Sequence, residues 1–76
     1  MTHYVLFTGQ NCNPCATVKT MLSQTPLKDG VTLEIVDAGL DERVVEFVVR
    51  TVPTLVNVDT KQPTTGAFNI IKELTK

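Results

Sequence analysis

The chain has 76 residues, of which 42% are hydrophobic and 20% charged, and its formal net charge at pH 7 is −1. This length predicts a single domain over residues 1–76. The composition is that of a globular chain rather than a disordered one. Lysine and arginine form no block anywhere in the sequence, so we expect no nucleic-acid binding through phosphate neutralisation.

The N-terminal stretch MTHYVLFTG has neither a basic segment nor a long apolar run. We therefore expect no signal peptide and no contact with a membrane. The expected location is the cytoplasm, where thiols are kept reduced. A single cysteine pair in that setting is more often catalytic or metal-binding than structural.

The first half of the chain alternates strand and helix patterns. The apolar residues within 3–9 (HYVLFTG) are consecutive rather than alternating, which is typical of a strand covered on both faces. Residues 14–24 (PCATVKTMLSQ) have helical spacing, and Pro14 suits the first turn because its missing N–H would have had no partner there. Residues 31–37 (VTLEIVD) alternate and predict a second strand.

The second half begins with a less decided segment. Residues 39–49 (GLDERVVEFVV) are rich enough in valine to allow a strand. Their acidic start favours a helix of about two to three turns. A strand at 54–58 and a short strand around 62–65 should follow, the latter at a sheet edge because it contains Pro63.

Residues 66–76 (GAFNIIKELTK) predict an amphipathic final helix with Ala67, Ile70 or Ile71, and Leu74 facing inward. The predicted element order is β-α-β-α-β-β-α. A strand, a crossover helix and a returning strand form a parallel pair, and a hairpin adds antiparallel strands. We therefore expect an α/β fold with a four-stranded mixed sheet flanked by helices.

The sequence contains only two cysteines, Cys12 and Cys15, placed three positions apart at the start of the first expected helix. Cys12 would lie at or next to the N-cap and Cys15 one turn later, so the two sulfurs can reach bonding distance. The unpaired N–H groups and partial positive charge of a helix N-terminus stabilise a thiolate. One thiolate could attack a target disulfide, and the other cysteine could then resolve the mixed disulfide.

Two other roles for the pair remain open. A structural zinc site needs four ligands, and the chain offers two thiols and His3 unless a second molecule contributes, so no metal is expected. A structural disulfide closing so short a loop would stabilise the fold only weakly. Redox exchange is the favoured interpretation.

Three features together resemble the glutaredoxins and the small ribonucleotide-reductase redoxins of the thioredoxin superfamily. They are the CxxC after the first strand, TVPT at 51–54, and the glycine of TTGAF at 64–68. The resemblance implies a thioredoxin fold and a monomeric dithiol–disulfide oxidoreductase that reduces protein disulfides, with ribonucleotide reductase as an acceptor. It implies no bound cofactor, and either glutathione or a flavoprotein thioredoxin reductase as external reductant.

The resemblance also implies the roles of individual residues. Cys12 would be the nucleophile and Cys15 the resolving thiol. A cis Val52–Pro53 bond would turn the backbone N–H and C=O of Val52 toward a substrate that adds as a short antiparallel strand. The residues expected to contact substrate are Gln10, Asn11, Asn13, Pro14, Thr51, Val52, Pro53, Thr65 and Gly66.

The chain departs from glutathione-using relatives at three places. Neutral Gln10 and Asn11 replace a basic residue before the CxxC, Asn13-Pro14 replaces an aromatic inside it, and Thr65-Gly66 replaces a double glycine. These changes should weaken glutathione binding. Two alternatives stay open: a glutathione-dependent reductase of mixed disulfides, and a non-catalytic module that bridges an iron–sulfur cluster between two copies of Cys12.

Overall fold

A computed structural model describes residues 1–75 of the chain. Lys76, which belongs to both the expected domain and the expected final helix, lies outside the described residues. Along the described part, strands and helices follow one another in the order that the sequence predicts. They are β1 (Thr2–Thr8), α1 (Asn13–Gln24), β2 (Val31–Asp37), α2 (Arg43–Glu46), β3 (Thr54–Asn57), β4 (Pro63–Thr65) and α3 (Ala67–Leu74).

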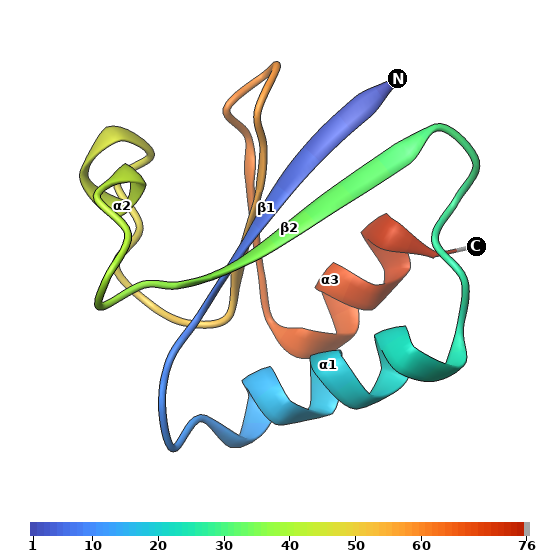
Figure 1. Cartoon of the computed structure of the whole chain (residues 1–76), viewed down its shortest axis with the longest axis horizontal. Coiled ribbons are helices and arrows are strands. Elements are labelled where there is room, and N and C mark those ends of the chain that lie inside the picture. Colours follow the sequence, from blue (N-terminus) through green and yellow to red (C-terminus); the bar gives the residue numbers. More distant parts are fainter. Residues whose placement is uncertain (76) are drawn as a thin grey trace.

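The strands form one 4-stranded mixed sheet in the order β2-β1-β3-β4 (Figure 1). β1 runs parallel to β2, and it pairs antiparallel with β3, where Leu6 stands opposite Leu55. β4 pairs antiparallel with β3 and forms one edge of the sheet. The predicted parallel pair and hairpin are therefore confirmed, and Pro63 lies on an edge strand, where proline is tolerated.

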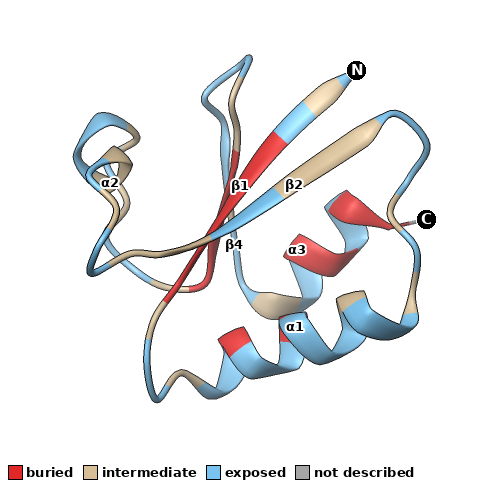
Figure 2. Cartoon of the chain, in the orientation of Figure 1, coloured by how far each residue is buried: buried red, intermediate tan, exposed pale blue. Residues whose placement is uncertain are grey.

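β1 is the buried centre of the sheet, as its unbroken apolar run predicts. Residues 4–8 are all buried (Figure 2). Tyr4 and Leu6 belong to one apolar cluster, whereas Val5 and Phe7 belong to another. Since successive side chains of a strand point to opposite faces, β1 supplies the core on both sides of the sheet.

The face of the sheet covered by α1 and α3, the α1–α3 face, holds the larger buried cluster. Its fully or nearly fully buried members are Tyr4, Leu6, Val18, Leu55, Ile70, Ile71 and Leu74. Figure 1 shows both helices on the same side of the sheet. The inward positions predicted for α3 are confirmed, with Ala67 only partly buried at the start of the helix.

The opposite face, the α2 face, is covered by α2 and the chain that follows it. Three buried residues, Val5, Phe7 and Val56, are packed there by partly buried neighbours that include Val44, Phe47 and Val52. The ring of Phe47 meets Phe7 edge to face, with a centroid separation of 6.2 Å.

The predicted length of α2 was wrong. α2 has 4 residues, Arg43–Glu46, instead of two to three turns. The segment is rich in β-branched valine, which loses side-chain freedom in a helix. Val48 then adopts the left-handed conformation at φ 55, and its neighbour Val49 donates its N–H to the carbonyl of Val44 at 2.8 Å. The chain therefore turns back after a single helical turn.

Candidate functional site

The two cysteines form a disulfide at the N-terminus of α1. Cys12 is the N-cap in an extended conformation, Pro14 lies in the first turn, and the Cα atoms of Cys12 and Cys15 are 5.2 Å apart. Asn11, at φ 55, turns the chain between β1 and the helix. The predicted placement of both cysteines at the start of a helix is confirmed.

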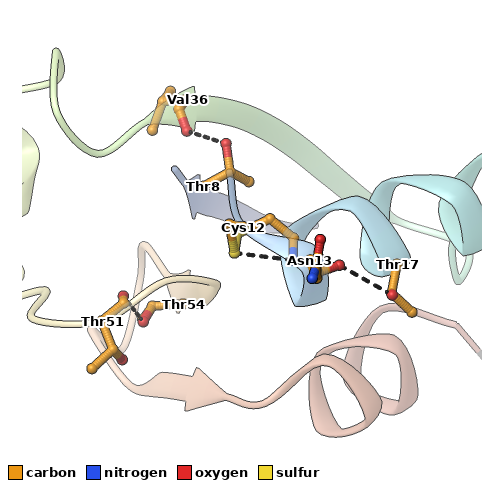
Figure 3. Close-up of a disulfide and its surroundings, with 8 residues drawn as sticks. Thr8, Cys12, Asn13, Thr17, Val36, Thr51 and Thr54 are labelled. Atoms are coloured by element: carbon orange, nitrogen blue, oxygen red, sulfur yellow. Dashed lines mark hydrogen bonds between the residues drawn. A yellow bond between two sulfur atoms is a disulfide. The ribbon is translucent and has the colours of Figure 1, made fainter. Parts of the chain in front are cut away.

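The two cysteines differ in exposure and in their hydrogen bonding. Cys12 is partly exposed, whereas Cys15 is only 1% exposed. The backbone N–H of Cys15 donates to the Cys12 sulfur at 3.2 Å, and Figure 3 shows this bond. When the pair is reduced, the same N–H and the helix dipole favour negative charge on Cys12 rather than on Cys15.

The end of β1 brings this disulfide close to a second segment. The buried Thr8 hydroxyl donates to the carbonyl of Val36 at 3.1 Å, which fixes the strand end to β2. Gly9 follows, and a Cβ added there would lie 3.0 Å from Cγ2 of Val52. Gly9 therefore allows the segment around Val52 to approach the chain that leads to Cys12.

The Val52–Pro53 peptide bond is cis, as the resemblance implies. Pro53 is buried, and the Thr54 hydroxyl donates to the carbonyl of Thr51 at 2.7 Å (Figure 3). Within residues 1–75, no backbone–backbone hydrogen bond engages Val52. Its N–H and C=O are therefore free to pair with an extended segment of another molecule.

The remaining predicted site residues lie around these two segments. Gln10, Asn11, Asn13 and Pro14 are exposed beside the disulfide in the chain. Residues 51–54, which contain the cis Val52–Pro53 bond, are called the cis-proline segment. Thr65 stands opposite Thr54 of this segment in the β3–β4 register. Gly66, at φ 85, is the N-cap of α3, and any residue with a side chain would be strained at this position.

Sequence reasoning missed a small cavity beside the cis-proline segment. The cavity has a volume of about 180 Å³ and is lined by Ala38, Val44, Val49, Arg50, Thr51 and Val52. We call it the α2 pocket. Its walls come together through the left-handed turn at Val48, and valine in a sequence carries no signal for that conformation.

An ion cluster on the α2 side was also missed. Arg43 contacts Asp41 at 2.7 Å and Glu34 of β2 at 2.8 Å. Hydrogen bonds from the Arg43 side chain, and then from its backbone N–H, hold the pKa of Asp41 at about 2. The Arg43 side-chain hydrogen bond likewise lowers the pKa of Glu34. The link between Arg43 and Glu34 of β2 requires the fold.

Residues 1–75 are the part of the chain that the structure describes. In that part of the chain, no group of three or more His, Cys, Asp or Glu residues could hold a metal ion. None of its helices combines the length and apolar character needed to cross a membrane. No protein-family model matches the chain, and no curated protein matches it either.

Proposed function

We propose that this chain is a glutaredoxin-like dithiol–disulfide oxidoreductase with a thioredoxin fold, which reduces disulfides in proteins. Support comes from the sheet order β2-β1-β3-β4, from the cysteine pair at the start of α1 and from the neighbouring cis-proline segment. The client disulfide would lie between Cys12 and Val52. The client chain would pair as an extended segment with the free backbone N–H and C=O of Val52.

The proposed reaction is a two-step thiol–disulfide exchange. The Cys12 thiolate attacks one sulfur of the client disulfide, which forms a mixed disulfide and releases a client thiolate that takes up a proton. The Cys15 thiol loses its proton and attacks the Cys12 sulfur, which forms the Cys12–Cys15 disulfide and releases the second client thiol. Two electrons and two protons pass to the client, and an external thiol or flavoprotein reductase restores the dithiol.

The unequal exposure of the two cysteines is the observation that carries this proposal. A client sulfur can approach Cys12, which is partly exposed, but not Cys15, which is 1% exposed. The Cys15 N–H that points at the Cys12 sulfur supplies a donor for its negative charge. Cys15 is close enough to resolve the mixed disulfide because the pair already forms a bond in the structure.

Single cysteine variants test the order of attack. Cys12→Ser should lose all reduction of a protein disulfide, because serine cannot form the mixed disulfide. Cys15→Ser should attack the client normally and then stop, so mixed disulfide should accumulate. Both variants are incubated, in reduced form, with a disulfide-bonded protein such as insulin, and products are separated without reductant and identified by mass spectrometry.

Accumulation of mixed disulfide on Cys15 in the Cys12→Ser protein would overturn the assigned roles. Full reductase activity in both variants would overturn the proposed function itself. The rival glutathione-dependent activity is measured with hydroxyethyl disulfide, glutathione and glutathione reductase. Faster turnover there than on insulin with a dithiol reductant would favour the rival.

A further inference from the structure

The α2 pocket borders the proposed client site. Thr51 and Val52 belong both to the cis-proline segment and to the wall of the pocket. Val52 also approaches Gly9, three residues before Cys12. A client segment paired with Val52 would therefore pass the mouth of the pocket.

The pocket is built by an unusual backbone turn. A β-branched residue in the left-handed region is a conformational outlier. Val48 adopts it at φ 55 while its side chain remains 64% exposed, so burial of that side chain does not explain it. The turn instead joins Val49 to Val44 through a 2.8 Å hydrogen bond, and both residues line the pocket.

The lining of the pocket defines the chemistry of an occupant. Most of the lining is apolar, from Ala38 and three valines, with Arg50 as its one cation. Among residues 1–75, the ion pairs within 4.0 Å involve Arg43 and not Arg50. The volume of about 180 Å³ is below the roughly 300–1,000 Å³ of small-molecule sites. The lining therefore favours an occupant that has one apolar side chain and a carboxylate near it.

We propose that the α2 pocket selects clients in which an apolar residue and then an acidic residue follow the reacting cysteine. This inference rests on the proposed function. An antiparallel client whose cysteine lies beside Val52 places its next two residues alongside Thr51 and Arg50. The first of these side chains enters the pocket. The second points to the opposite side of the client strand, where its carboxylate meets the long, exposed side chain of Arg50. Glutathione has only glycine after its cysteine and leaves the pocket empty.

The test measures single-turnover reduction of cyclic disulfide peptides by the full chain, reduced beforehand and freed of reductant. Four peptides differ only in the two residues after one cysteine: Leu-Glu, Leu-Gln, Ala-Glu and Ala-Gln. A fifth peptide carries Glu-Leu before the same cysteine. Reactions are quenched with acid, and the Cys12–Cys15 disulfide formed is measured by mass spectrometry after alkylation of free thiols.

We expect Leu-Gln to react about tenfold faster than Ala-Gln at low peptide concentration, since one apolar side chain in a pocket gives discrimination of this order. Ala38→Leu, which fills the pocket, should remove most of the preference for leucine over alanine. Arg50→Gln, at an exposed position, should remove the roughly threefold preference for Glu over Gln. Lys28→Gln, an exposed cation beyond the far end of α1, is the matched control and should retain both preferences.

Each outcome separates this inference from the proposed function. Wild-type protein that reduces no peptide and not even hydroxyethyl disulfide contradicts the proposed function. Wild-type protein that reduces all five peptides equally contradicts only the pocket. Preferences that persist in both Ala38→Leu and Arg50→Gln also contradict the pocket, and a faster reaction with Glu-Leu before the cysteine overturns the assigned direction. Thermal unfolding verifies that Ala38→Leu is folded, and Arg50→Gln tests the pocket independently if it is not.

Discussion

The two faces of the sheet are built differently although the same central strand supplies both. The α1–α3 face has two helices of 12 and 8 residues and a cluster in which Leu6, Ile70 and Leu74 are 0% exposed. The α2 face has a helix of 4 residues and leaves Val45 80% exposed. Burial on the first face fixes the helix that carries the cysteines, whereas the second face leaves open surface beside the cis-proline segment.

This difference separates stability from recognition. Apolar burial of about 25 cal/mol per Å² is the main favourable contribution to folding, so the α1–α3 face should dominate stability. The α2 face keeps its shape through local contacts, including the Val49–Val44 hydrogen bond and the Arg43 ion pairs. Changes at the exposed and partly buried residues of the α2 face should therefore be tolerated by the fold, unlike changes at its buried residues Val5, Phe7 and Val56.

The largest expected effect comes from deleting core atoms on each face. Ile70→Ala should cost about 2–5 kcal/mol of unfolding free energy, because Ile70 is fully buried. Val44→Ala, at a partly buried position, should cost less than about 1 kcal/mol. Denaturant unfolding measures both. Ile70→Val, with an expected cost of about 0.5–1.5 kcal/mol, remains measurable if the alanine variant does not fold. Equal losses for Ile70→Ala and Val44→Ala would contradict the comparison.

A smaller effect, of opposite sign, should come from the left-handed turn of the α2 face. Val48→Asn should raise the unfolding free energy by about 1 kcal/mol, because asparagine adopts this conformation more readily than a β-branched residue. Val45→Asn is the matched control, since Val45 is also exposed but lies within α2. It should give no gain. Thermal unfolding of both variants decides the matter, and a loss of stability in Val48→Asn would show that the turn is not strained.

The smallest effect concerns the pH dependence of stability. The folded pKa of Asp41 is about 2, below its ordinary value of about 3.9. The stabilisation from the ionised carboxylate is therefore fully present above its unfolded pKa and is lost as the pH falls from about 4 toward 2. Asp41→Asn should lower the melting temperature near pH 6 slightly and make its decline below about pH 4 shallower.

Asp59→Asn serves as the control for this pH series, because Asp59 is exposed in the β3–β4 turn and forms no ion pair within 4.0 Å among residues 1–75. Melting temperatures are measured by circular dichroism. Parallel acid profiles for the wild-type protein and Asp41→Asn would mean that the Arg43 ion pairs make no contribution to the stability of the α2 face.

Sequence patterns were sufficient for the elements whose faces are set by burial. The consecutive apolar residues of β1 and the inward stripe of α3 were read correctly, because each pattern follows directly from the geometry of its element. β2 is a strand, as its alternation predicts, but its burial does not alternate, since Ile35 is exposed. Strand boundaries differ by a residue: β1 begins at Thr2 rather than His3, and β3 ends at Asn57 rather than Val58. Such differences are normal at element ends.

The structure of the α2 region could not be predicted from the sequence to the same extent. Its length depends on the left-handed conformation of Val48, which valine residues rarely adopt and no local pattern indicates. The candidate site was partly visible, since both cysteines and Pro53 carry strong sequence signals. The approach of Gly9 to Val52 joins segments more than forty residues apart, and only the assembled sheet reveals it.

The edge strand β4 affects whether molecules of this protein can aggregate by extending the sheet. β4 has 3 residues, and one of them, Pro63, has no backbone N–H to offer. A neighbouring molecule that extended the sheet at this edge could form few backbone hydrogen bonds, which disfavours fibre growth there. The strand at the opposite edge of the sheet, β2, is 7 residues long, and its Ile35 is 46% exposed. Any tendency of the protein to aggregate by sheet extension should therefore begin at β2.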